Sequence, residues 1–288
     1  MSNEGRNTGT GETIISVDGI ELCAESFGNP EHPPILLVMG ALASMVWWDA
    51  AFCRELADKG RFVIRYDNRD VGRSTFYPPG APGYNIEDMV DDALRMLDHY
   101  RVDKAHFVGM SLGGMIAQLA ALRNPDRVLT ITMLSSSVWD SGQDLPPVDQ
   151  KILDYHAQAG SIDWSDEEWA IRYMVGGWKL LNGSKHAFDE RQAAKLAEEE
   201  YHRARSFLSM FNHALLKGGE SYYGKASSIR VPALVMHGTE DPVLPFPHAK
   251  AIERAIPQAR LITLEGRGHE IHPDDWDLII EEIVRHTA

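Results

Sequence analysis

The sequence predicts an α/β fold in which a mostly parallel central sheet is flanked by helices. Short apolar segments without alternation are typical of strands buried on both faces of a parallel sheet. The chain carries six of them, at residues 35–39, 62–66, 105–109, 128–134, 233–236 and 261–264. Helical patterns lie between these segments, and a repeated strand–helix order places helices on both faces of the sheet.

The element expected first is a β-hairpin. Residues 13–16 and 20–26 alternate around Val17-Asp18-Gly19, and an Asp-Gly pair between alternating segments is a strong hairpin signal. The later segments with helical character are residues 47–59, 86–100, 113–123, 247–255 and 276–285. Residues 113–123 are apolar almost throughout, as expected of a helix buried against a sheet.

Between residues 140 and 226 the strand signals give way to charged helical segments. The segments are 147–159, 165–181 and 187–216, and Ser165 with Glu168 forms a capping box before the second. We therefore expect a core interrupted by a helical lid. The expected units are residues 1–139 (core, with 1–12 disordered), 140–226 (lid) and 227–288 (core).

Composition and charge exclude several classes of protein. With 44% hydrophobic and 24% charged residues the chain is not a disordered one, and a net charge of −14 argues against binding nucleic acid or an anionic membrane. Its two cysteines, Cys23 and Cys53, have no CxxC spacing, and the N-terminus has no apolar segment typical of a secretory signal. We expect a cytoplasmic, globular protein with a small-molecule substrate. A homodimer is one candidate for its oligomeric state.

A Gly-x-Ser-x-Gly motif at residues 109–113 stands directly between a predicted buried strand and a predicted helix. This context is that of the tight strand–turn–helix elbow that lifts a serine Oγ clear of the sheet. The two glycines allow the strand and the helix to approach closely. A chance match in a glycine-rich loop is the weaker alternative, because the flanking elements fit the elbow. Ser111 is therefore the candidate nucleophile.

A nucleophilic serine needs a general base, and the base needs a carboxylate that orients it. Elbow architectures carry these groups in the order Ser, acid, His, each on a loop after a strand. Asp241 and His269 follow the last two predicted strands and fit this order after Ser111. Glu240 is the rival acid and His272 the rival base.

Acyl transfer also requires hydrogen-bond donors for the oxyanion. The backbone N–H of Leu112 is one candidate, because it opens the helix after the serine. Ala41, which follows Gly40 in the loop after the strand at 35–39, is the other, and the alternative is an ordinary small loop residue. The chain has no HExxH motif and no clustered Cys or His, so we expect neither a metal nor a cofactor.

The predicted lid is expected to set the substrate preference. Its acidic stretches, 166–168 and 198–200, are expected on its solvated outer face, and Trp, Met and Phe side chains on its inner face. An apolar pocket of this kind prefers neutral or hydrophobic acyl groups. Trp169 and Met174 are the lid residues chosen for tests of chain-length preference. The other candidates for the pocket wall are Trp47, Trp48, Trp139, Trp164 and Trp178.

The charged run 65–74 follows a buried strand. One interpretation is functional: Arg69 and Arg73 bind the substrate. On the interpretation favoured here they brace neighbouring loops, because charges paired with one another satisfy their hydrogen bonds.

Five motifs together resemble the α/β-hydrolase superfamily, over about residues 13–288. They are Leu-Val-Met-Gly (37–40), the charged run 65–74, Gly-Met-Ser-Leu-Gly-Gly (109–114), Gly-Thr-Glu-Asp-Pro (238–242) and Gly-Arg-Gly-His (266–269). Met-Gly in place of the commoner His-Gly is similar to aclacinomycin methylesterase and its bacterial relatives. The resemblance implies an α/β-hydrolase fold, the triad Ser111, Asp241 and His269, and oxyanion donors at Ala41 and Leu112.

We therefore expect a serine hydrolase that cleaves a carboxylic ester, with a methyl ester as one candidate, of a small, largely apolar molecule through an acyl-enzyme. C–C bond hydrolysis, enol-lactone opening and a perhydrolase reaction are alternatives on the same triad. A ligand sensor with slow turnover is an alternative from another class. Dehalogenase and epoxide hydrolase chemistry is disfavoured, because both use an aspartate at the position of Ser111.

Overall fold

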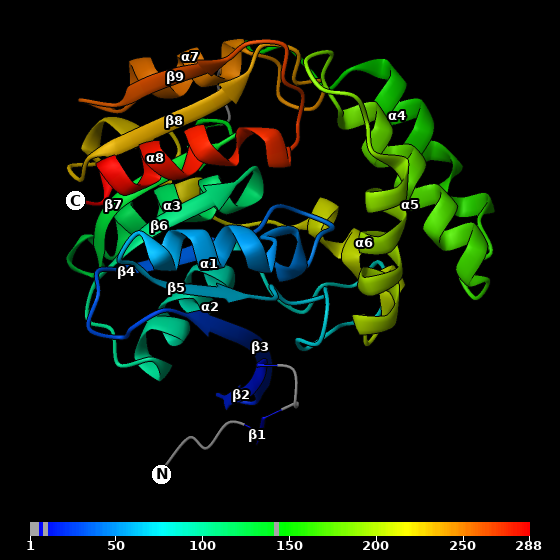
Figure 1. Ribbon diagram of the computed structural model, residues 1–288, viewed down its shortest axis with the longest axis horizontal. Coiled ribbons are helices and arrows are strands. Elements are labelled where there is room, and N and C mark those ends of the chain that lie inside the picture. Colours follow the sequence, from blue (N-terminus) through cyan, green and yellow to red (C-terminus); the bar gives the residue numbers. More distant parts are fainter. Residues whose placement is uncertain (1–5, 8–10, 141–143) are drawn as a thin grey trace.

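The computed structural model describes residues 6–7, 11–140 and 144–288, and its centre is one twisted sheet (Figure 1). The strand order is β1-β2-β3-β5-β4-β6-β7-β8-β9. The bounds are β1 (Arg6–Asn7), β2 (Thr13–Val17), β3 (Ile20–Phe27), β4 (Pro34–Val38), β5 (Phe62–Tyr66), β6 (Ala105–Met110), β7 (Val128–Leu134), β8 (Ala233–Gly238) and β9 (Arg260–Leu264). Neighbours from β5 to β9 pair in parallel, and β1, β2, β3 and β5 pair antiparallel. The predicted mostly parallel sheet is confirmed.

Helices cover both faces of this sheet. Successive strand side chains point to opposite faces. Leu36 of β4 belongs to the core cluster that includes residues of α2, α3 and α7, whereas Leu37 belongs to the cluster that includes residues of α1 and α8. The helices are α1 (Ala50–Asp58), α2 (Ile86–His99), α3 (Leu112–Arg123), α4 (Gln150–His156), α5 (Glu167–Leu181), α6 (Glu190–Arg203), α7 (Pro247–Ala255) and α8 (Trp276–His286). Within the described residues, none of these helices is long and apolar enough to cross a bilayer.

The N-terminal hairpin forms as the sequence predicts. Asp18 and Gly19 turn the chain from β2 to β3 with φ of 50° and 84°, the positive values that a tight hairpin turn requires. The expectation of disorder over residues 1–12 is wrong at two places. Arg6 and Asn7 pair with β2, and Glu12 is buried because it forms an ion pair with Arg203 at 2.8 Å. Residues 1–5 and 8–10 of that segment lie outside the described residues.

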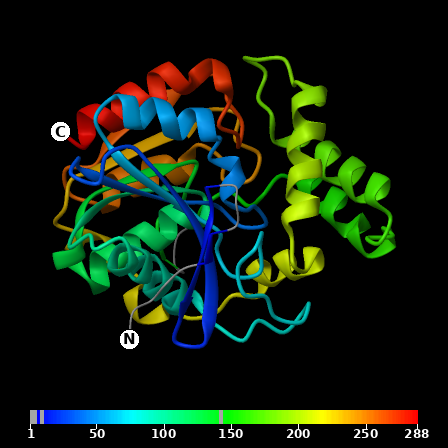
Figure 2. The same cartoon turned by 60° about the horizontal axis from the view of Figure 1, so that its bottom comes forward.

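Helices α4, α5 and α6 stand together at one side of the sheet in both views (Figures 1 and 2). The helix expected at 187–216 ends at Arg203, because Ala204 has an extended backbone (ψ 126°), and a 3₁₀ segment follows at Phe207–Leu215. The predicted cap of α5 is also wrong. Asp166 accepts the Trp169 N–H, while the Ser165 hydroxyl bonds to Asp163.

Candidate active site

Ser111 occupies the turn between β6 and α3 with φ 52° and ψ −117°, a backbone conformation that a non-glycine residue adopts only when its surroundings impose it. Its N–H donates to the Leu134 carbonyl at 2.9 Å. A Cβ on Gly109 would lie 2.2 Å from the Gly113 backbone, and one on Gly113 would lie 2.0 Å from the Val38 oxygen. The strand and the helix therefore cross at the distance that only these glycines allow.

The His269 Nδ1–H donates to Asp241 Oδ2 at 2.7 Å, and both side chains are almost fully buried. This hydrogen bond places the proton on Nδ1 and leaves Nε2 free to accept another. The second Asp241 oxygen accepts the N–H groups of Val243 and Leu244, both at 2.8 Å. The His269 N–H donates to the Leu181 carbonyl at 2.8 Å, so the end of α5 fixes the backbone of His269.

Electrostatics keep Asp241 ionised. Burial by itself raises the pKa of Asp241, but the His269 imidazole and its hydrogen bond, the nearby His237 and the Leu244 N–H together hold that pKa below its usual value. His237 is fully buried and donates from Nε2 to the Leu244 carbonyl at 2.6 Å. It therefore supports the loop that carries the carboxylate.

A cavity of about 430 Å³ brings the predicted residues together, because Ser111, His269 and Ala41 all line it. A Cβ on Gly40 would lie only 3.1 Å from the Ser111 Cβ, so the loop that carries Ala41 lies against the serine. Leu112 is the first residue of α3, and an N–H at that position has no acceptor within the helix. Asp241 lies behind His269.

His213 positions the Ala41 loop and was missed by the sequence analysis. Its Nδ1 accepts the Leu42 N–H at 3.0 Å, and its Nε2 donates to the Arg69 carbonyl at 2.7 Å. Burial lowers the pKa of His213, which favours the neutral ring that this pair of bonds requires. No motif marks this histidine, because its two partners lie 171 and 144 residues away in the chain.

The rival residues lie elsewhere. Glu240 is exposed and accepts the N–H and hydroxyl of Ser184 at 2.8 and 2.7 Å. His272 accepts the Asp274 N–H at 3.2 Å. The geometry thus pairs Asp241, and not Glu240, with His269.

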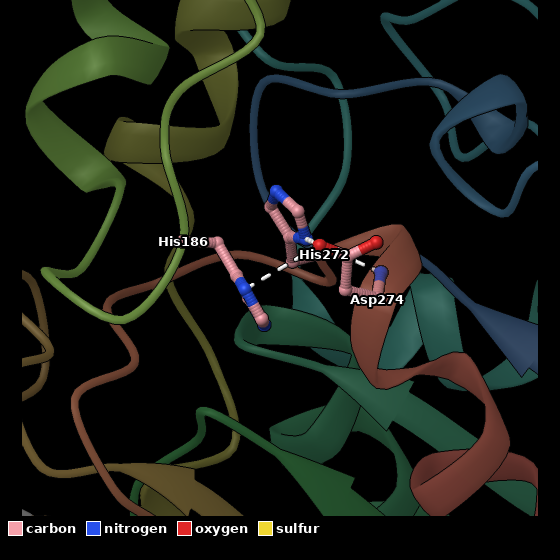
Figure 3. Close-up of side chains that lie close together, drawn as sticks. All are labelled: His186, His272 and Asp274. Atoms are coloured by element: carbon pink, nitrogen blue, oxygen red, sulfur yellow. Dashed lines mark hydrogen bonds and ion pairs between the residues drawn. The ribbon is translucent and has the colours of Figure 1, made fainter.

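His272 instead belongs to a small cluster with His186 and Asp274 (Figure 3). One ligand atom from each lies within 4.8 Å of the others, so this donor set could hold a metal ion, a grouping that the sequence analysis did not predict. The two imidazole rings stack at 4.3 Å, and His186 lies between the carboxylates of Asp274 (3.4 Å) and Asp275 (3.3 Å). These contacts account for the cluster through ion pairs and stacking.

Arg69 and Arg73 both face protein carboxylates. Arg69 forms a bidentate pair with Asp92 at 2.6 and 2.9 Å, and Arg73 contacts Glu12 at 2.6 Å. This arrangement is the bracing one, in which the guanidinium groups tie loops together.

A second cavity, of about 450 Å³, adjoins the first. The residues shared by both linings are Trp47, Trp178, Leu181 and His269. The two tryptophan rings meet edge to face with their centroids 4.4 Å apart. His269 therefore has one cavity on the side of Ser111 and another beyond the tryptophan pair.

The tryptophans predicted for the pocket divide into two groups. Trp47 and Trp178 line the cavities, whereas Trp48 lies in the core and Trp139 donates to the Gly219 carbonyl. Trp164 packs against Tyr173, Phe207 and Phe211.

For the two lid residues chosen for tests, the prediction is right for one and wrong for the other. Met174 lines the cavity, but Trp169 is 50% exposed and lies under the Arg172 guanidinium. The physical reason is helical periodicity, since five residues at 3.6 per turn place the two side chains on well-separated faces of α5.

The acidic stretch 198–200 is also only partly as predicted. Glu198 and Glu199 are exposed, but Glu200 is 6% exposed and lines the cavity of Ser111. Its carboxyl group accepts the Ser44 N–H at 2.8 Å, and this bond turns the residue inward from α6.

Comparisons with known proteins identify the fold and the family of the chain. A model of the alpha/beta hydrolase fold matches residues 33–163, and a model described as TAP-like protein matches residues 218–276. The rhodomycin D methylesterase DauP of Streptomyces sp. (strain C5) is 32% identical over 95% of this chain and 97% of its own. Among solved structures, the esterase RhEst1 from Rhodococcus sp. ECU1013 covers 96% of this chain and 97% of its own, with a TM-score of 0.76 and 22% identity. The enol-lactonase from Burkholderia xenovorans LB400 covers 95% and 98%, with a TM-score of 0.75 and 22% identity.

Proposed function

The chain belongs to the α/β-hydrolase fold family and is a hydrolase that acts on ester bonds, and on this premise we propose that it cleaves a carboxylic ester of a small, largely apolar molecule through an acyl-enzyme on Ser111. The observation that carries the proposal is the hydrogen bond between His269 Nδ1 and Asp241. This bond leaves Nε2 of His269 free to accept a proton, and His269 lines the same cavity as Ser111. The likeness to a methylesterase supports a methyl ester as one candidate substrate.

In the proposed mechanism His269 Nε2 takes the proton of Ser111 as the serine Oγ attacks the ester carbonyl. Asp241 holds the imidazole in the tautomer that can accept this proton and stabilises the imidazolium that forms. The N–H groups of Ala41 and Leu112 receive the oxyanion. The alcohol leaves with the proton from His269, and a water molecule then repeats the sequence on the acyl-enzyme. No metal or cofactor takes part in these steps.

We further propose that residues 140–226 act as a lid with a specificity role. Two observations support this: α5 contributes Met174 and Trp178 to the cavity wall, and its last residue, Leu181, holds the backbone of His269. Aliphatic and aromatic side chains form most of the lining, which favours neutral, apolar acyl groups.

A substrate panel tests this function. Purified protein is assayed with p-nitrophenyl and methyl esters of increasing acyl length, with enol-lactones, and with diketones that would be cleaved at a C–C bond. The ester assays are repeated with hydrogen peroxide present to detect a perhydrolase reaction. We expect multiple turnovers with esters of medium apolar acyl groups. Enol-lactones are included because one protein of similar fold is an enol-lactonase. If the protein opened lactones faster than it hydrolysed every ester, lactone opening would replace ester hydrolysis as the proposed reaction. A single slow burst would instead favour a ligand sensor.

Met174→Ala is expected to shift the acyl-length preference. The substitution removes side-chain volume from the cavity wall, so longer acyl chains should gain relative kcat/KM by about three- to tenfold over short ones. Trp169→Ala on the exposed face of α5 is the matched control and should leave the profile unchanged. A flat profile in both variants would remove α5 as a specificity element.

A further inference from the structure

Glu200 lines an otherwise largely apolar cavity, the one that Ser111 also lines. Among the described residues that line this cavity it is the only acidic one, and neither a lysine nor an arginine accompanies it. Its side chain is almost entirely removed from bulk solvent. A carboxylate in such surroundings is costly unless a hydrogen-bond donor or a cation compensates it.

One residue, Ser44, supplies the hydrogen bonds that compensate this carboxyl group. Oε1 accepts the Ser44 N–H at 2.8 Å, and the Ser44 hydroxyl is a second hydrogen-bond partner. Within the described part of the chain, no basic side chain forms an ion pair with Glu200. Its carboxyl group therefore has capacity for a further donor.

An ionic cluster lies beside Glu200. Arg203 contacts Glu12 at 2.8 Å and Asp67 at 3.0 Å. Arg73 contacts Glu12 through its side chain at 2.6 Å and Asp67 through its backbone N–H at 2.8 Å. Both guanidinium groups thus have carboxylate partners other than Glu200 among the described residues.

The surroundings of Glu200 favour its protonated form. Burial raises the pKa of Glu200 to about 7, and the Asp67 charge acts in the same direction against the opposing effects of the Ser44 N–H and Arg203. A hydrogen-bond donor on a ligand would offset the cost of burying this carboxylate, as protonation does.

We propose that Glu200 forms a polar subsite in the acyl cavity, which binds a hydroxyl or ammonium group carried by the acyl part of the substrate. The inference rests on the proposed ester hydrolysis and narrows its substrate class. The preferred substrates are esters whose apolar acyl group carries one hydrogen-bond donor away from the carbonyl. A purely structural role, in which Glu200 only holds Ser44, predicts no such preference.

The experiment compares p-nitrophenyl hexanoate with its 6-hydroxy and 6-ammonio derivatives, together with the same sets one and two carbons shorter and longer. For the best-fitting length we expect the donor-bearing ester to have a roughly tenfold higher kcat/KM than the plain ester. Glu200→Gln keeps an acceptor for Ser44 but loses the carboxylate, and it should remove this ratio for the ammonio ester, because an ammonium group cannot accept from the amide NH₂. Glu198→Gln, on the exposed face of the same helix, should keep it.

The outcomes separate the two proposals. If no wild-type ester is hydrolysed, the proposed function fails. If plain esters are hydrolysed but the ratio for the ammonio ester is the same in wild type and Glu200→Gln, or if neither donor-bearing ester is preferred at any length, the subsite is wrong. Calorimetric binding of methyl 6-hydroxyhexanoate and methyl hexanoate to the Ser111→Ala protein tests the subsite without turnover. Tighter binding of the hydroxy ester supports the subsite, and equal affinities would overturn it.

Discussion

Replacing Ser111 with alanine is expected to lower kcat for ester hydrolysis by at least about 10⁴-fold, because the substitution removes the hydroxyl group that is proposed to form the acyl-enzyme. His269 and the two oxyanion donors remain in place, so residual activity reflects binding and oxyanion stabilisation alone. Steady-state hydrolysis of p-nitrophenyl esters by the purified variant is the measurement.

Loss of folding would mimic this result, so the thermal unfolding of the variant is compared with that of the wild type. Ser161→Ala, at an exposed serine of the predicted lid, is the control and should keep full activity. Activity near the wild-type level in a folded Ser111→Ala protein would contradict the assignment of the nucleophile.

Asp241→Asn is expected to lower kcat by about 10³- to 10⁴-fold through the tautomer of His269. The asparagine oxygen can still accept the Val243 and Leu244 N–H groups, which turns its NH₂ group toward His269. The imidazole then accepts at Nδ1 and carries its proton on Nε2, where it cannot take the proton of Ser111.

The adjacent carboxylate offers a matched control for this experiment. Glu240→Gln changes the same charge one residue away, but Glu240 is exposed and bonded to Ser184, so kcat should stay within about twofold of the wild type. If the two variants lost activity equally, the orienting role of Asp241 would be wrong.

The sheet and the elbow could be predicted from sequence because their signals are local. Buried parallel strands appear as short apolar segments. Ser111 follows β6 directly, and Asp241 and His269 lie in the loops after β8 and β9. The parallel order then brings these strand ends to one edge of the sheet, where Asp241 meets His269 at 2.7 Å.

The inward turn of Glu200 could not be predicted, because it depends on a contact across the chain. In sequence the residue ends a run of three glutamates, which is typical of a solvated helix face. Its burial follows from the Ser44 N–H, 156 residues away. His213 escapes prediction for the same reason, since its role is defined by Leu42 and not by its neighbours in the chain.

The sequence also does not predict which side chains of the lid point toward the cavity. Trp169 and Met174 are both apolar residues of one helix, and burial distinguishes them only once the face of α5 that meets the core is known. Helical periodicity predicts that they differ but not which of them points inward.

Covalent labelling distinguishes Ser111, as the nucleophile activated by His269, from every other residue of the chain. Protein treated with a fluorophosphonate probe is digested, and tandem mass spectrometry locates the adduct. We expect one phosphonyl group on Ser111, no labelling of Ser111→Ala, and much slower labelling of Asp241→Asn. An adduct on any other residue, or equal labelling of the Ser111→Ala protein, would show that Ser111 is not the nucleophile.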